Sequence, residues 1–254
     1  MRAMIFAAGL GTRLKPITDT LPKALVPIAG QPLLEHTLTK LEKAGYNKIV
    51  INVHHFADQV EAYLSERDGL AKVLISDERD FLRETGGGIR HAEPLLKSPA
   101  NLSIGQNNPY FLVHNVDILS NLDLSWFRQD IQKDALAVLL VSERETSRYL
   151  LFDPQSMRLV GWTNIKTGEI KSPYPNLAIN KCKKLAFSGI HLISDDVFPL
   201  MKSYPEKFSI IDFYLSLADK YPIYGKNADG LKMIDVGKLN SLDQAEAFVR
   251  GGSL

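Results

Sequence analysis

The sequence predicts an α/β fold with a Rossmann-like, mainly parallel mixed sheet flanked by helices. Two observations lead to this prediction. Apolar strand patterns alternate with helical stripes over the first 120 residues, and shorter strand patterns separated by turns follow in the second half. Strands joined by single helices form βαβ units, which have parallel strands. The later short strands predict a small β-rich insertion in the same domain.

In the first half, each element follows from a local pattern. One helix is predicted between Pro32 and Gly45. Proline suits the first turn of a helix, and glycine often ends one. Apolar runs rich in β-branched residues predict strands at 4–8, 48–53, 73–76 and 110–116. Glycines at 86–88 favour a loop before a helix at 89–96, and residues 98–109 have loop composition.

The second half predicts shorter elements. Helical patterns lie at 124–131 and 210–220, and either Asn240 or Ser241 can cap a final helix that runs to residue 249. Strand patterns lie at 135–142, 149–152, 159–162, 169–170, 184–193 and 233–236. No repeat, linker or low-complexity tract interrupts the chain, so we expect one domain over 1–254, with a change of pattern near residue 120.

Composition excludes several classes of protein. The 254 residues include 30 Lys and Arg against 29 Asp and Glu, so the basic surface of a nucleic-acid-binding protein is not expected. Cys182 is the only cysteine, which excludes an intrachain disulfide and a zinc site built from cysteines. The longest apolar run, 135–141, is too short to cross a membrane, and the amino terminus reads as a buried strand rather than a signal peptide. We therefore expect a cytoplasmic protein.

Polar residues follow several of the predicted parallel strands. Right-handed crossovers bring the carboxyl ends of such strands to one edge of the sheet, where ligands bind. Gly9, Glu78 and Asp117 each lie just beyond a predicted strand. We therefore expect these distant segments to meet at one rim.

The segment 9–23, GLGTRLKPITDTLPK, predicts a phosphate-binding loop. Glycines let backbone N–H groups approach phosphate oxygens, and Arg13 and Lys23 supply positive charge. A dinucleotide-binding fingerprint would need glycine where Leu14 stands, and the Gly-Lys-Ser/Thr ending of a P-loop is absent. The alternative is an ordinary strand-to-helix turn with solvated charges.

The extended pattern resembles the signature of the sugar-1-phosphate nucleotidyltransferases. GLGTR-x-x-P-x-T followed by Pro-Lys carries the resemblance, together with VPIAGQPLLEHTL at 26–38, RETGGGI at 83–89, FSGIHLIS at 187–194 and IDVGKLNSLDQAEAF at 234–248. The resemblance implies the nucleotide-diphospho-sugar transferase type of fold, with a nucleotide-binding part at 1–120. It assigns residues 121–254 to a sugar-binding part and a carboxyl-terminal helix. The ETGGG segment is most similar to members that use UTP and N-acetylmuramate 1-phosphate in cell-wall recycling.

The resemblance also implies a set of site residues. Carboxylates at strand ends otherwise often form turns or cap helices, but the family binds Mg²⁺ at the positions of Asp117 and Asp235. The residues it places in catalysis are Arg13, Lys23, Asp117 and Asp235. Those it places around the nucleotide are Ala7, Ala8, Gly9, Gly11, Thr12, Arg13, Lys23, Glu84, Thr85, Gly86 and Asn115, and those it places around the sugar are Arg148, Tyr149, Ser188 and Gly189.

The implied reaction joins a nucleoside triphosphate to a sugar 1-phosphate and releases pyrophosphate. The expected partners are these two small molecules, with no nucleic acid and no membrane, and the oligomeric state is open. Three alternatives remain: a guanylyltransferase acting on mannose or heptose 1-phosphate, a non-catalytic regulatory protein that binds a nucleotide sugar, and a metal-dependent glycosyltransferase. The last usually needs an Asp-x-Asp motif, whereas Asn115 stands two residues before Asp117.

Two further residues have expected positions. His114 lies within an apolar strand pattern and is expected to be a buried core histidine rather than a base. Val116 replaces a glycine that is common in the family, and its Cβ is expected to narrow the space beside the ribose.

Overall fold

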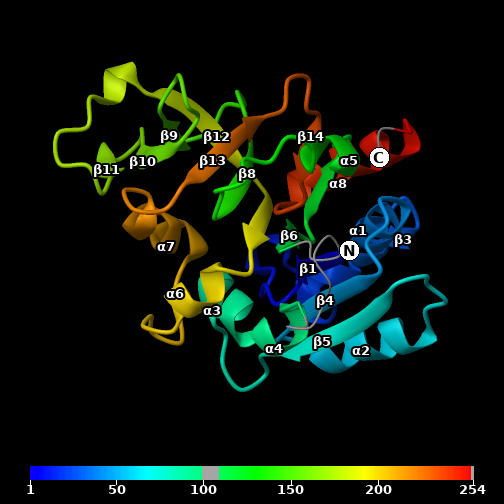
Figure 1. Cartoon of the computed structure of the whole chain (residues 1–254). Helices are drawn as coiled ribbons and strands as arrows, with labels where there is room; N and C mark the ends of the chain where they lie inside the picture. The colour runs from blue at the N-terminus through cyan, green and yellow to red at the C-terminus, as the bar shows by residue number, and fades with distance from the viewer. Residues whose placement is uncertain (99–108, 253–254) are drawn as a thin grey trace.

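The computed structural model describes residues 1–98 and 109–252, so the loop expected at 98–109 lies almost wholly outside the described residues. A ten-stranded sheet forms the centre of the molecule (Figure 1). Its main path runs β11-β10-β9-β12-β6-β1-β4-β5, and β8 and β13 join it beside β12. The predicted α/β fold with a mixed sheet is confirmed.

The half of the sheet that comes from the first 115 residues is parallel, as predicted. Its strands are β1 (Arg2–Phe6), β4 (Lys48–Val53), β5 (Lys72–Asp77) and β6 (Tyr110–Asn115). Their registers align Phe6 with Asn52 on one side and with Asn115 on the other. The ends of three strands therefore meet at one edge.

The other half of the sheet is largely antiparallel. The 12-residue strand β12 (Lys183–Ser194) pairs with β6, β8 and β9 and so connects the two halves. The remaining strands are β8 (Ala137–Ser142), β9 (Arg148–Phe152), β10 (Leu159–Asn164), β11 (Glu169–Lys171) and β13 (Ile223–Asn227). Strands β9, β10 and β11 form the predicted β-rich insertion (Figure 1).

Helices cover both faces of the sheet. On the first face lie α1 (Leu33–Lys43) and α2 (Ala57–Glu66), and α8 (Leu242–Arg250) joins the same hydrophobic core. The second is covered by α3 (Glu84–His91), α4 (Glu93–Leu96), α6 (Val197–Met201) and α7 (Ile210–Leu217). A short helix, α5 (Leu124–Phe127), joins the first core. Within the described residues, every helix is too short or too polar to cross a membrane.

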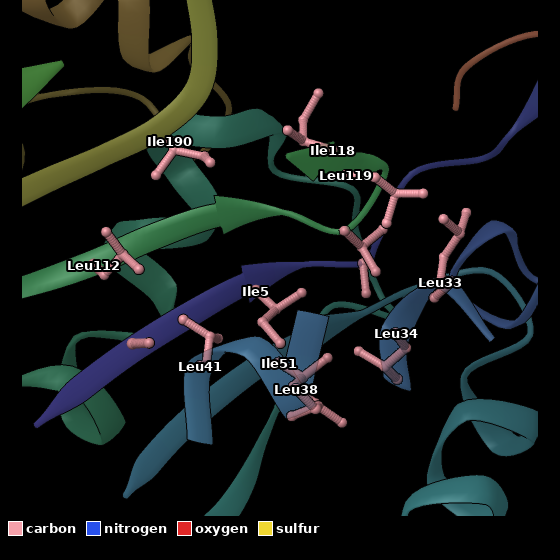
Figure 2. Packing of buried hydrophobic residues seen from close by; sticks show 14 of the residues in the cluster. Ile5, Leu33, Leu34, Leu38, Leu41, Ile51, Leu112, Ile118, Leu119 and Ile190 are labelled. Carbon is pink, nitrogen blue, oxygen red and sulfur yellow. The ribbon is translucent and has the colours of Figure 1, made fainter. Parts of the chain in front are cut away.

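Alternation along the strands explains the two helical layers. In β1, Ala3 and Ile5 belong to one hydrophobic core and Met4 to the other. Successive side chains of a strand point to opposite faces, so a strand that is apolar throughout needs cover on both. Figure 2 shows the first core, where Leu38 of α1 lies close to Ile51 of β4.

Short elements complete the fold and shape its ligand edge. The strand pairs are β2 (Pro27–Ile28) with β3 (Gln31–Pro32) and β7 (Ile118–Ser120) with β14 (Met233–Asp235). The 3-10 helices are Thr12–Leu14, Ile17–Asp19, Lys23–Leu25, Ile179–Lys181 and Leu239–Ser241. The sequence patterns did not predict β2, β3, β7, β13 or α6, most of which are too short to show a period.

Two predicted elements were wrong. Gly86–Gly88 lies inside helix α3, which begins at Glu84, rather than in a loop before a helix. A Cβ on Gly86 or Gly87 would collide with Phe208 or with the carbonyl of Glu206, so the glycines let α3 pack directly against that segment. The helix expected at 124–131 ends at Phe127, and Asp130 follows with a φ of 53°, in the left-handed region where an α-helix cannot continue.

Candidate active site

The loop after β1 turns sharply at Gly11. Its φ is +64°, and a Cβ there would lie 2.9 Å from Cγ2 of Thr18, so both conformation and space favour glycine. The Gly11 carbonyl accepts hydrogen bonds from the Leu14 N–H and the Thr18 hydroxyl, both at 2.8 Å. Leu14 is buried while Thr12 and Arg13 are exposed. The turn therefore holds Arg13 at the surface beside the ligand edge of the sheet.

The two predicted metal-binding aspartates meet through the small sheet of β7 and β14. Asp235 pairs with Ile118, the residue after Asp117, and the N–H of Val236 donates to the Asp117 carbonyl at 2.8 Å. Residues that are 118 positions apart in sequence are thus held side by side by backbone hydrogen bonds.

Charges of both signs surround these carboxylates. The ammonium group of the nearly buried Lys23 forms an ion pair with Asp117. The pKa of Asp235 is raised, first because neighbouring protein atoms partly desolvate its carboxyl group and second because Asp117 repels it. Lys23, Arg13 and Arg144 oppose this increase in pKa through their positive charge. The four residues predicted to act in catalysis therefore interact electrostatically in one cluster.

Gly237 provides the space in which Arg13 and Asp235 come together. A Cβ at this position would lie 2.6 Å from Oδ1 of Asp235 and 2.9 Å from Nη2 of Arg13. The residue is buried, so its small size keeps a carboxylate and a guanidinium group close to each other without a covering side chain.

Replacing Gly237 with alanine is expected to reduce activity without unfolding the protein. The new methyl group would displace the ends of two flexible side chains rather than the backbone. Misplacement of catalytic groups by about 1 Å can cost a factor on the order of 100 in rate. We expect kcat/KM to fall about 10- to 100-fold while the thermal midpoint is nearly unchanged. Full activity of the purified variant, measured as pyrophosphate release, would contradict this geometry.

A cavity of about 270 Å³ opens beside the cluster, at the carboxyl ends of the parallel strands. Among the predicted nucleotide and metal residues, its lining includes Ala7, Ala8, Gly9, Lys23, Glu84, Thr85, Asn115 and Asp117. Gly11, Thr12, Arg13, Gly86 and Asp235 lie outside this lining. Val116 also lines the cavity.

The amino-terminal turn of α3 forms one wall of the cavity. Glu84 and Thr85 line it directly, and the Gly86 N–H donates to the Phe208 carbonyl at 2.9 Å. The Thr85 hydroxyl accepts a hydrogen bond from the Ile210 N–H at 2.9 Å, at the start of α7. The wall is therefore fixed by the segment that leads into α7.

Asn52 is a site residue that the sequence analysis did not identify. Its Oδ1 accepts hydrogen bonds from the N–H groups of Ala7 at 2.8 Å and Ala8 at 3.4 Å, and its Nδ2 donates to Glu78 at 2.8 Å. Asn52 and Glu78 both line the cavity, and Glu78 is fully buried. The available signal was the one polar side chain among the apolar residues that follow Lys48 in the strand KIVINV.

Replacing Asn52 with leucine is expected to destabilise the fold and weaken nucleotide binding. The change removes the acceptor for two N–H groups and leaves the Glu78 carboxyl without the amide that donates to it. Unpaired buried polar groups cost about 2 to 3 kcal/mol here. Urea unfolding would measure the loss, and an unchanged unfolding midpoint would show that this network does not hold the loop.

The predicted sugar residues do not form one group. Arg148 lines a second cleft of about 500 Å³, whereas the hydroxyl of Tyr149 accepts a hydrogen bond from the Thr146 N–H at 3.1 Å. Adjacent strand residues point to opposite faces, so the two side chains diverge. Gly189 lies against the amide of Asn115, where a Cβ would be 2.8 Å from Nδ2. Ser188 is buried, and its hydroxyl has no hydrogen-bond partner among the described residues.

The chemistry of the aspartate pair suits a hard divalent cation. Mg²⁺ is usually bound by one or two carboxylates and completes its shell with substrate phosphates and water. Asp117 and Asp235 provide two carboxylates, and their mutual repulsion would be relieved by a cation. Across residues 1–98 and 109–252, no group of three or more His, Cys, Asp or Glu side chains could hold a metal ion. A cation at the two aspartates would therefore need further ligands from substrate phosphates and water.

His114 is a core residue, as expected. It is 1% exposed, its Nδ1 lies 2.8 Å from the Asn115 carbonyl oxygen, and burial lowers its pKa to about 4. The imidazole of His114 is therefore neutral near pH 7 and packs within the strand, and it is not placed to transfer a proton.

Comparison with known proteins identifies relatives over parts of the chain and over most of it. The chain is 55% identical to the N-acetylmuramate alpha-1-phosphate uridylyltransferase of Caulobacter vibrioides over 97 residues, which span 37% of the chain and 40% of that relative. It is 28% identical to the D-glycero-alpha-D-manno-heptose 1-phosphate guanylyltransferase of Campylobacter jejuni, over 84% of each chain.

Solved structures and a family profile extend the match to nearly the whole chain. The crystal structure of HddC from Yersinia pseudotuberculosis complexed with GMP-PN has a TM-score of 0.72 and 21% sequence identity, covering 98% of this chain and 99% of HddC. This likeness shows the fold. Residues 2–251 match the sequence profile of the family described as nucleotidyl transferase. The chain therefore belongs to the nucleotidyl transferase family.

Proposed function

We propose that the protein is a sugar-1-phosphate nucleotidyltransferase that makes a nucleoside-diphosphate sugar and pyrophosphate. One observation carries the proposal: Arg13, Lys23, Asp117 and Asp235 form a single electrostatic cluster beside a cavity at the ligand edge of the sheet. A regulatory protein would need only to bind its nucleotide, and it would have no need to gather these four charges at one point.

The proposed reaction is an in-line displacement at phosphorus. An oxygen of the sugar 1-phosphate attacks the α-phosphorus of the triphosphate, a new P–O bond forms, and the bond to the bridging oxygen breaks to release pyrophosphate. The nucleophile is largely ionised near neutral pH, because a phosphate monoester has a second pKa of about 6. No side-chain base is required, so the protein contributes through positioning and charge.

The chain's own residues have distinct parts in this proposal. Arg13 holds the departing β- and γ-phosphates with its forked guanidinium group. Lys23 bridges the phosphates at the reacting centre, while Asn52 fixes the backbone of Ala7 under the base. Mg²⁺ on Asp117 and Asp235 would supply charge neutralisation for the α-phosphate and the sugar phosphate.

The proposed substrates are UTP and N-acetylmuramate 1-phosphate. We propose that the protein acts on them in the cytoplasm, as part of cell-wall recycling. The high identity to the Caulobacter relative, although confined to 97 residues, supports this pair. The second candidate is a guanylyltransferase that acts on a heptose 1-phosphate. It is supported by a match of lower identity that spans 84% of both chains.

A substrate panel tests the proposal. Pyrophosphate release would be measured for four nucleoside triphosphates, each combined with the 1-phosphates of N-acetylmuramate, heptose, mannose and glucose. We expect the highest turnover with UTP and N-acetylmuramate 1-phosphate. Turnover with GTP and a heptose 1-phosphate would favour the second candidate. Nucleotide binding by calorimetry without turnover of any pair would favour the regulatory protein.

A further inference from the structure

The second cleft, of about 500 Å³, lies over one face of the β-rich insertion. The register of β9, β10 and β11 arranges that face in two rows across the strands. All six residues of the rows line the cleft, because side chains two positions apart on a strand share a face. The rows are Arg148–Asn164–Glu169 and Leu150–Trp162–Lys171.

Most charges in this cleft are neutralised within it. Lys171 lies 2.9 Å from Asp212 and 3.8 Å from Glu169, and these are the two acidic residues of the lining. The side chain of Arg148 is exposed and makes no ion pair or hydrogen bond with any residue of 1–98 or 109–252. An unneutralised guanidinium group therefore faces the cleft.

Arg144 connects the cleft with the reaction centre. It lines the cleft at the start of the loop before β9, and its Nη2 donates to the Phe187 carbonyl at 3.0 Å. Two residues beyond Phe187 on β12, Gly189 lies against the amide of Asn115, which lines the first cavity. A ligand in the cleft would thus meet Arg144 on the side that faces the reacting phosphates.

We propose that this cleft binds a sugar 1-phosphate that carries a carboxylate as a second anionic group, and that Arg148 binds this carboxylate. The inference rests on the proposed function, because it gives the specificity of the same site. Arg144 lies toward the phosphate end of such a substrate. Arg148, four residues further along the chain, supplies a second cation on the floor of the cleft.

The chemistry of the floor fits such a substrate better than a neutral one. A guanidinium group binds a carboxylate through two parallel hydrogen bonds, whereas a sugar hydroxyl gives only one. Asn164, directly opposite Arg148 in the strand register, adds an amide, while Leu150 and Trp162 provide apolar surface beside it. N-acetylmuramate carries a lactyl ether with one methyl group and one carboxylate, which would use both kinds of surface.

The test compares two sugars that differ only in the lactyl group. The kcat/KM of the wild type and of Arg148→Met would be measured with UTP and either N-acetylmuramate 1-phosphate or N-acetylglucosamine 1-phosphate. We expect the variant to lose about 10- to 100-fold with the acidic sugar and less than about 3-fold with the neutral one. Arg148→Lys should recover part of the loss, since it keeps the charge without the fork.

A matched control removes a cation outside the cleft. Lys184 is exposed on β12, does not line the cleft and makes no ion pair with any residue of 1–98 or 109–252, so Lys184→Met should leave both kcat/KM values unchanged. If Arg148→Met lowers kcat/KM equally with the two sugars, or with neither of them, the proposed role of Arg148 is overturned. Thermal midpoints of both variants identify any loss that comes from unfolding.

Calorimetric titration separates this inference from the proposed function. The two sugar phosphates would be titrated directly into the wild type and into Arg148→Met. Tighter binding of the acidic sugar by the wild type, lost in the variant, supports the inference even if neither sugar is turned over. Equal affinity for both sugars, or binding of neither, overturns it. Absence of pyrophosphate release with every triphosphate would overturn the proposed function instead.

Discussion

Replacing Asp235 with asparagine is expected to lower kcat/KM by about 100-fold or more without a loss of stability. The side chain loses the charge with which it would bind the cation and stabilise the transferring phosphate. The pKa of the Asp235 carboxyl is raised in the folded protein, so its ionised form is disfavoured there relative to the unfolded chain. At neutral pH an uncharged amide removes this unfavourable contribution. The thermal midpoint should therefore stay level or rise.

The direction of the pH effect follows from the same shift. An acid with a raised pKa in the folded state destabilises that state as pH rises through the unfolded-state and folded-state pKa values. Asp117→Asn provides the contrast, because it leaves the nearly buried Lys23 ammonium without its ion-pair partner. We expect this variant to lose both activity and thermal stability. A stable, active Asp235→Asn enzyme would contradict the role of Asp235.

Replacing Arg13 with methionine is expected to reduce kcat/KM by about 100-fold or more. Removing one charged donor from a phosphoryl transition state costs several kcal/mol, on the order of 3. Arg13 is exposed and lies next to Asp235, so its replacement should change the free energy of unfolding only slightly. Steady-state pyrophosphate release and a thermal scan would measure the two quantities on the same preparation.

Lys15→Met is the matched control for Arg13. Lys15 lies in the same loop and is exposed, and its ion pair with Asp19 is exposed as well. Its loss should change kcat/KM by less than about 2-fold, since exposed ion pairs contribute little. Equal effects of the two substitutions would show that the loop acts only through its overall charge.

Most of the charged cluster of Arg13, Lys23, Asp117 and Asp235 could be expected from the sequence because its signals are local. The glycine turn at Gly11, the cations Arg13 and Lys23 and the strand-end carboxylate of Asp117 can each be recognised within a few residues. Bringing Asp235 beside Asp117 required β14, which was expected at 233–236, to pair with β7, a three-residue strand that the sequence did not predict. The assignment of Asp235 depended on the family resemblance instead.

The remaining features depend on contacts between distant segments. Glycines at 86–88 disfavour a helix locally, yet they allow α3 to approach Phe208, and this packing outweighs their intrinsic preference. Asn52 has a role only because Ala7 and Glu78 lie on either side of it in the folded sheet. Arg148 and Tyr149 were assigned to one substrate, but strand alternation places only Arg148 in the cleft.

The most direct test of the account is a crystal structure of the protein with UTP and Mn²⁺, which substitutes for Mg²⁺ and gives an anomalous signal. We expect one anomalous peak between the carboxylates of Asp117 and Asp235, with the triphosphate running from that ion toward Arg13 and the base in the cavity beside Asn52. A nucleotide bound elsewhere, or an ion held away from both aspartates, would contradict the central claim.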